Sequence, residues 1–156
     1  MLSLKFHLRV TVAAAGLAAA LPAAAQFQKP EDAIKYRQSA MFVMSQHFGR
    51  VGAMANGKVP FDAAAAQANA EVALSMSKLP LVAFGEGTDK GGNTKAKPEI
   101  WTKKADFDSK GKSMQDEMVK LAAAAKTGNL DQIKAAFDGA GKSCKACHDD
   151  YREKQN

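Results

Sequence analysis

Four stretches of the sequence repeat apolar residues at alternating intervals of three and four, the spacing that places side chains on one face of an α-helix. They follow Pro30, Asp62, Pro98 and Asn129, and segments rich in glycine and proline separate them. No stretch shows a convincing strand pattern, and only 7% of the residues are aromatic while alanine is abundant. The sequence therefore predicts an all-α fold, an antiparallel four-helix bundle.

The expected helix ends carry local signals. Pro30 suits the first position of a helix, and Asp62 suits an N-cap. Asn129 or Asp131 starts the last helix, whereas Gly52 and the run Asn56-Gly57-Lys58-Val59-Pro60 are expected to end the first. The residues expected to face inward on the second helix are Ala65, Ala68, Val72, Met76 and Leu79. Residues 81–97 lack a sustained period and hold several glycines, so they are expected to form a long loop.

The first 25 residues are expected to be a secretory signal peptide outside the fold. A basic segment precedes an apolar stretch at residues 10–21, and three alanines precede Gln26 at a suitable cleavage site. The apolar stretch is shorter than the roughly 20 residues of a membrane helix, which favours cleavage over a retained anchor. We therefore expect a periplasmic domain of residues 26–156 with no membrane anchor.

Charge and composition narrow the function classes. The formal net charge is +6, which permits an acidic partner. No basic patch is interleaved with aromatic residues, so nucleic-acid binding is not expected. No acid/base pair or nucleophile constellation stands out, so an enzyme is not expected either.

Cys144 and Cys147 are the two cysteines, and His148 completes a C-x-x-C-H motif near the C-terminus. This motif is the attachment signature of c-type haem. On a helix, thiols three positions apart lie on nearly the same side, so both can form thioethers with the haem vinyl groups. The next residue, His148, can then bind the iron as the proximal ligand. The sequence predicts one haem c, attached through Cys144 and Cys147, with His148 as the metal ligand.

Two other uses of the cysteine pair are disfavoured. A thioredoxin-like redox pair belongs near a strand-to-helix turn, and no such unit is predicted here. A zinc site needs further clustered cysteine or histidine ligands, and only His7 and His47 remain in the sequence. Haem attachment also agrees with the export signal and the helical context.

A second protein ligand to the iron would have to come from an earlier helix, because no methionine or histidine follows His148. The first helix is the expected opposite wall, and Met41, Met44 and His47 are its candidates. Met41 lies on the apolar stripe, where its thioether can bind the iron or pack close to it without a bond. His47 is the weaker candidate, because it can point to solvent or cap a neighbour.

Three further side chains are expected near the haem. Arg37 shares the face of Met41, and a buried guanidinium requires an anion, which the haem propionates would supply. Arg152 follows His148 by four residues and is expected beside the proximal imidazole. Trp101 follows the glycine-rich loop and is expected to cover the haem edge.

Short stretches along the whole expected domain resemble cytochrome c′, the class II c-type cytochromes. The matching stretches are Lys29-Pro30-Glu31-Asp32, residues 36–40, His47-Phe48-Gly49-Arg50, residues 84–88, Pro98-Glu99-Ile100-Trp101 and residues 144–152. The resemblance implies a four-helix bundle, commonly a homodimer through its first two helices, with a five-coordinate high-spin haem. It also implies binding of NO and CO, discrimination against O2 and a link to NO tolerance.

The same resemblance assigns expected positions to individual residues. Met41 matches the apolar side chain that blocks the haem face opposite the proximal histidine, where leucine or phenylalanine is commoner. Arg37 and Gln38 would contact the propionate side, Glu99 and Trp101 would lie beside the haem, and Arg152 would lie near His148.

Two functions remain open at this point. In the first, Met41 crowds a five-coordinate iron and only ligands that bind strongly, such as NO and CO, displace it. In the second, His148 and Met41 both bind the iron in an electron carrier like the low-spin cytochrome c556 type, which would need a redox partner protein.

Overall fold

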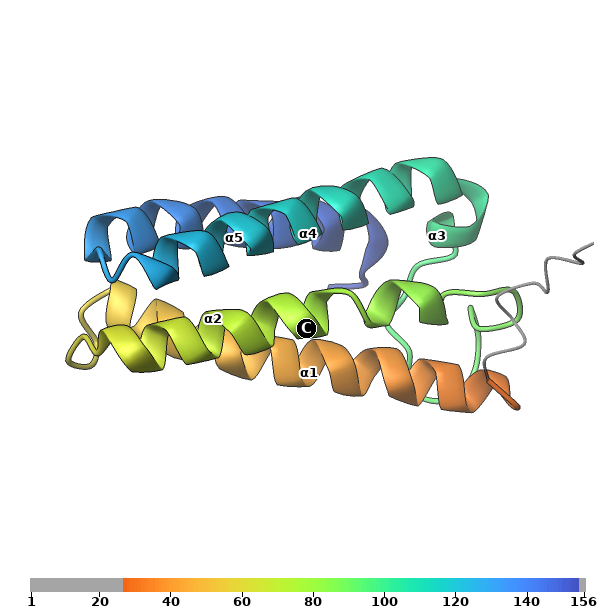
Figure 1. The fold of residues 1–156 in the computed structure, drawn as a ribbon. Helices are drawn as coiled ribbons and strands as arrows, with labels where there is room; N and C mark the ends of the chain where they lie inside the picture. The colour runs from red at the N-terminus through yellow and green to blue at the C-terminus, as the bar shows by residue number, and fades with distance from the viewer. Residues whose placement is uncertain (1–26, 155–156) are drawn as a thin grey trace, which may run out of the picture.

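The computed structural model describes residues 27–154, and these fold as a bundle of four long helices with two short helical turns (Figure 1). The elements are α1 (Pro30–Ala55), α2 (Ala63–Ser77), the 3-10 turn η2 (Pro80–Ala83), α3 (Glu99–Thr102), α4 (Lys104–Lys126) and α5 (Leu130–Tyr151). The expected signal peptide, residues 1–25, lies outside the described residues.

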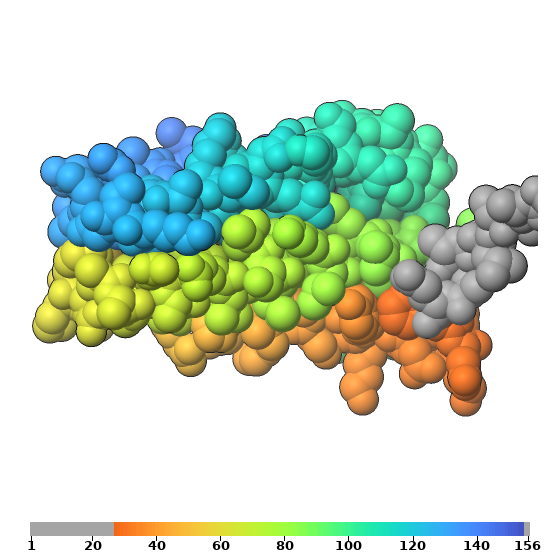
Figure 2. All heavy atoms as spheres, viewed as in Figure 1, coloured from red at the N-terminus to blue at the C-terminus, as the bar shows by residue number. Residues whose placement is uncertain are grey.

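The long helices form two antiparallel pairs. α1 packs along α2, and α4 packs along α5, so Figure 1 shows two layers. The layers meet through extensive contact of α2 with α4, whose atoms touch along much of the face seen in Figure 2. Contact of α1 with α5 is less extensive. The predicted four-helix bundle is confirmed.

Three helix starts were predicted correctly. α1 begins at Pro30, as expected of a residue whose missing N–H costs nothing in the first turn. The Asp62 side chain accepts a hydrogen bond from the Ala65 N–H at 2.9 Å. The Asn129 side chain accepts from the N–H groups of Asp131 and Gln132, both at 3.0 Å, so Asn129 and not Asp131 is the cap of α5.

α1 ends at Ala55, directly before the run of residues 56–60 that was expected to end it, and it continues through Gly52. Gly52 is buried, and a Cβ atom there would lie 2.4 Å from Cζ of Phe137 on α5. The Phe137 ring stacks on Phe48 of α1 with centroids 4.3 Å apart. Gly52 therefore provides space for a close approach of α1 to α5 and does not terminate the helix.

The inward face of α2 was also predicted wrongly. The buried residues are Ala66, Ala70, Ala73 and Ser77, which form a stripe next to the one expected. Of the expected residues, Ala68 is exposed and the other four are half-buried. Small side chains allow close packing of α2 on both neighbours, and this outweighs the greater hydrophobicity of the larger side chains on the adjacent stripe.

The segment between α2 and α4 is a loop that contains two short helical turns and one isolated β-bridge. Its first residues form η2, and the third helical region divides into α3 and α4 at Lys103. The residues between η2 and α3 make an isolated antiparallel bridge, Ala96 with Arg152, at the end of α5. Within residues 27–154, no helix combines the length and hydropathy needed to cross a bilayer.

Candidate functional site

The C-x-x-C-H motif lies in the last turns of α5. Cys144, Cys147 and His148 are half-buried, whereas Lys145 and Ala146 between them are exposed. The helical spacing therefore turns the two thiols and the imidazole toward the protein and the intervening residues toward solvent. Both cysteines are free thiols.

The two thiols border different apolar clusters. Cys144 packs against the bundle core, which is built from all four long helices and includes Val51, Met118 and Ile133. Cys147 packs against a second cluster, here called the aromatic cluster, whose buried members are Phe84, Ile100, Phe107 and Tyr151. The motif thus lies at the junction of the two clusters, where a flat apolar group bonded to both thiols would contact each of them.

Burial shifts the pKa values of the two thiols and the imidazole in the motif. Desolvation raises the pKa of both the Cys144 and the Cys147 thiol above its ordinary value. The pKa of His148 is lowered, first by burial and second by the positive charge of Arg152, with a partial offset from Asp149. A lowered pKa favours the neutral imidazole, which is the form that binds a metal.

The three candidates on α1 for a second iron ligand have different neighbours. Met41 is half-buried and packs against the aromatic cluster beside Cys147. Met44, one turn later, packs against the bundle core to which Cys144 also belongs. His47 Nδ1 forms a hydrogen bond of 2.8 Å with the side-chain oxygen of Asn69 on α2, so this ring is held by the neighbouring helix.

Arg37 is 2% exposed and is bonded to the segment after α2. One terminal nitrogen donates to Ala83 O at 3.0 Å and to Thr88 Oγ1 at 2.9 Å. The other donates to Thr88 O and Thr94 Oγ1, both at 2.8 Å. Burial lowers the pKa of Arg37 to about 10. Neutral oxygens accept hydrogen bonds from both terminal nitrogens of this guanidinium, and its contact with a haem propionate stays a prediction.

Trp101, Gln38 and Glu99 have the following surroundings, and their contact with a haem stays a prediction. Trp101 is half-buried against the aromatic cluster and donates from Nε1 to Gly85 O at 2.9 Å. Gln38 donates to the side chain of Asn93 at 3.1 Å. Glu99 is exposed in the first turn of α3.

Arg152 is the C-cap of α5 and is exposed. Its N–H donates to the His148 carbonyl at 3.0 Å, and its charge acts on the His148 ring as described above. The expected proximity of Arg152 to the imidazole thus has an electrostatic counterpart in the structure.

Sequence reasoning missed the polar partners that connect these elements. Thr88 and Thr94 accept from Arg37, and the Tyr151 hydroxyl donates to Asp106 on α4 at 2.5 Å. This hydrogen bond is the main reason that the pKa of Tyr151 is raised to about 12. Thr88 and Thr94 lie about 50 residues from Arg37 in the sequence, so no local pattern links them to it. The only hint in the sequence is that two threonines occur in a glycine-rich loop.

The donor set fits a haem c better than a bare metal ion. Within residues 27–154, no group of three or more histidine, cysteine or acidic side chains is arranged to hold an ion. A porphyrin brings its own ring of nitrogen ligands, so one imidazole is a sufficient protein ligand. Two half-buried thiols beside apolar clusters, followed by a half-buried imidazole, provide the attachment points and the ligand.

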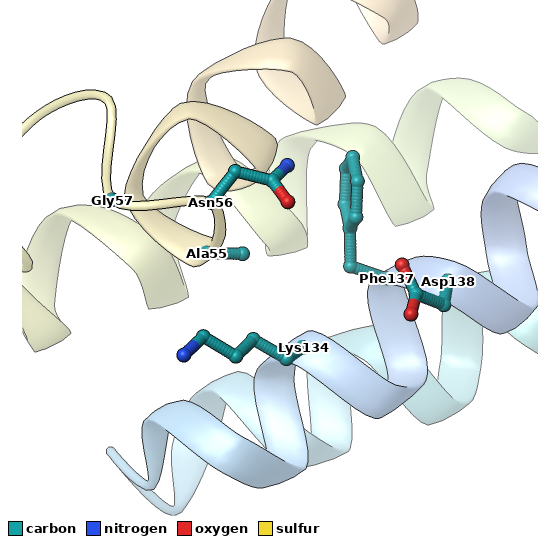
Figure 3. Close-up of a pocket in the computed structure, with 6 residues that line it drawn as sticks. All are labelled: Ala55, Asn56, Gly57, Lys134, Phe137 and Asp138. Atoms are coloured by element: carbon teal, nitrogen blue, oxygen red, sulfur yellow. The ribbon is translucent and has the colours of Figure 1, made fainter.

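A pocket elsewhere on the molecule is separate from this site (Figure 3). Its lining residues come from the end of α1 and the first half of α5: Ala55, Asn56, Gly57, Lys134, Phe137 and Asp138. At 1.5 Å per residue, the α5 residues precede Cys144 by about 9 to 15 Å along the helix.

Comparison with known proteins gives consistent matches. The sequence profile described as Cytochrome C′ matches residues 32–152. Cytochrome c′ from Alcaligenes xylosoxydans xylosoxydans and cytochrome c′ from Rubrivivax gelatinosus are each 54% identical to this chain, and each match covers 83% of the chain and 100% of the relative. A cytochrome c-554 from Cereibacter sphaeroides is 32% identical over 86% of this chain and 90% of its own length.

Solved structures agree with these relatives. The crystal structure of cytochrome c′ from Rubrivivax gelatinosus superposes with a TM-score of 0.80 at 53% identity, covering 82% of this chain and 100% of that one. The nitric oxide complex of a leucine-to-alanine mutant of cytochrome c prime from Alcaligenes xylosoxidans has a TM-score of 0.77 at 53% identity, covering 83% and 99%.

Proposed function

The chain belongs to the cytochrome c′ family, and from this premise we propose that it is an exported haem protein whose iron binds nitric oxide and carbon monoxide. Haem c is its cofactor, attached covalently through Cys144 and Cys147. The proposal assigns it the role of a gas-binding protein or electron carrier, for NO tolerance or electron transfer, and not that of an enzyme.

The observation that carries the proposal is the pairing of Met41 with the motif. Met41 and Cys147 pack against the same aromatic cluster from opposite helices, and His148 directly follows Cys147. A haem held by these thiols would be bordered by His148 on one side and approached by α1 on the other. In this proposal His148 is the proximal ligand and Met41 limits access to the opposite face.

When bound, the haem supplies an iron with a coordination position for a diatomic ligand. The residues of this chain then decide how accessible that position is. A crowding Met41 side chain has to repack before a ligand fits, so only a ligand whose bond to iron is strong offsets that cost. Solved relatives include a cytochrome c prime variant from Alcaligenes xylosoxidans with bound NO, which supports NO as a ligand here.

An absorption spectrum of the reduced protein, recorded with and without CO, tests this function. A five-coordinate iron gives a broad high-spin Soret region that changes when CO is added. Sharp low-spin bands that CO leaves unchanged would contradict the proposal and support axial ligation by both His148 and Met41.

That second candidate, an electron carrier with two axial protein ligands, has its own support. The thioether of Met41 can bind iron, and Met41 packs against the same aromatic cluster as Cys147. Its function would require a redox partner protein, whose encounter the net positive charge would steer toward an acidic surface.

Export to the periplasm forms part of the proposal, based on the signal-like residues 1–25. The intact mass of the mature protein is expected to correspond to one haem c on a chain that begins at Gln26. A mass that retains the leader would contradict cleavage at this site.

We further propose a homodimer formed through α1 and α2. Large apolar side chains are exposed on α1, including Phe42 at 63%, Tyr36 at 37% and Val43 at 36%. In a symmetric dimer, each of these side chains would be buried in both protomers.

Replacing Phe42 by lysine should weaken this dimer. Burying a phenylalanine contributes about 1.5 to 3 kcal/mol. Two copies per dimer would therefore raise the dissociation constant on the order of a hundredfold or more. Sedimentation equilibrium measures the change, and Val119→Lys, a 52% exposed apolar position on α4, is the matched control. Equal dissociation constants for the two variants would contradict an interface on α1.

A further inference from the structure

The loop of residues 84–97 is bonded to both walls of the haem site. Near its beginning it holds Arg37 of α1, and at its end it pairs with the residues that follow His148. In Figure 1 this segment runs at the end of the bundle that also contains α3 and the start of α1.

Most of the bonds to α1 come from one side chain, and Gln38 adds hydrogen bonds to the carbonyl and side-chain oxygens of Asn93. Arg37 donates to Thr88 Oγ1, Thr88 O and Thr94 Oγ1 as well as to Ala83 O. Its guanidinium also lies 4.3 Å from the centroid of the Phe84 ring. These four hydrogen bonds use both terminal nitrogens fully and leave only Nε–H to donate to another acceptor.

The bonds to α5 are made mainly by the backbone. Lys97 N–H donates to Tyr151 O at 3.0 Å, and Glu153 N–H donates to Lys95 O at 2.9 Å. The Lys97 ammonium adds a bond of 3.0 Å to Asp149 O, the carbonyl of the residue after His148. The loop therefore holds the last turn of α5 from the residue next to the predicted iron ligand onward.

Direct contact between α1 and α5 is strong at the opposite end, where Gly52 meets Phe137. Arg37 lies one turn before Met41, and residues 149–153 lie directly after His148. The two residues proposed to border the iron are thus each within one helical turn of an attachment point of the same loop.

We propose that Arg37 is a positioning residue that anchors residues 84–97, and that this loop sets the position of Met41 relative to His148. The proposal rests on the proposed function only in assigning Met41 and His148 to the two haem faces. It differs from the role in which Arg37 acts by pairing with a propionate, because it makes the loop threonines as important as the arginine.

The test removes the acceptors and leaves Arg37 unchanged. A Thr88→Val, Thr94→Val double variant deletes two oxygens that Arg37 bonds, whereas Thr88→Ser, Thr94→Ser retains them. Thr127→Val is the matched control, because its hydroxyl bonds only the Ala124 carbonyl and the Asn129 N–H, at the turn between α4 and α5. Hydrogen exchange by mass spectrometry is measured on the ferric haem protein without added gas, together with its absorption spectrum.

In the valine variant we expect amide exchange to become about tenfold faster or more, both in residues 84–97 and in residues 149–154. The high-spin bands of the ferric spectrum should shift with it, and the serine variant should restore both measurements. Faster exchange in residues 84–94 alone, with wild-type exchange at Lys97 and Glu153, would overturn the coupling. The proposal would also fail if the valine variant kept wild-type exchange and spectrum while an Arg37→Lys variant had an altered spectrum. That result would assign Arg37 a direct role at the haem. The exchange result does not depend on gas binding, so it stands or fails separately from the proposed function.

Discussion

Replacing Cys144 and Cys147 together by alanine should yield a polypeptide without covalently bound haem. The two thiols are the free cysteines of the chain and lie half-buried on one side of α5 next to His148. Without them no thioether can form, and a single imidazole holds a porphyrin only reversibly. The expected result is a chain whose mass equals that of the polypeptide alone and which retains no pigment after extraction with acidic acetone.

The control for this experiment is Ser143→Ala, which changes a neighbouring half-buried residue whose hydroxyl bonds the Ala140 carbonyl at 2.8 Å. It should retain the haem and the spectrum of the unchanged protein. Pigment that survives extraction from the double cysteine variant would contradict attachment through these residues. Each single variant should keep one thioether and therefore an intermediate yield of haem.

Replacing Met41 by alanine should accelerate CO binding to the reduced protein. Repacking an occupied apolar site typically costs about 1 to 3 kcal/mol, and each 1.4 kcal/mol corresponds to about a factor of ten in rate. If Met41 crowds the iron, its removal should raise the association rate on the order of tenfold to a hundredfold. Flash photolysis or stopped-flow mixing with CO measures this rate.

Met44→Ala is the matched control, because Met44 lies one turn further on α1 and packs against the bundle core, not the aromatic cluster. It should leave the CO rate within a few-fold of the unchanged protein. If Met41 is instead an axial ligand, the original protein will be low-spin and Met41→Ala will convert it to a high-spin form that binds CO. An unchanged spectrum and an unchanged CO rate would contradict both roles.

The fold was largely predictable because its signals are local. Pro30, Asp62 and Asn129 begin their helices through bonds or steric effects within one turn, and periodic apolar residues reveal the helices between them. The errors occur where packing decides. Gly52 was expected to help end the first helix, but it lies inside α1, where Phe137 of α5 packs against it. The small-residue stripe of α2 is buried in preference to its larger neighbours.

The residues of the candidate site also fall into those that the sequence could predict and those that it could not. The cysteine pair and His148 are contiguous, so their chemistry is visible in five residues. Met41 was predicted to face the motif because a bundle brings the first helix to the last, and it packs against the same aromatic cluster as Cys147. The partners of Arg37 could not be predicted, since Thr88 and Thr94 become its neighbours only when the loop folds back over α1.

The order of residues alone thus determined that helices form, where most of them begin and which short segment carries the cofactor, because these depend on interactions within a few residues. Only the tertiary structure decided which helix faces are buried and which oxygens satisfy a buried arginine. It also decided that residues 84–97 bond both to α1 and to the end of α5. These outcomes depend on close packing and on hydrogen bonds between groups far apart in the chain, and the energies of such contacts exist only once the helices are assembled.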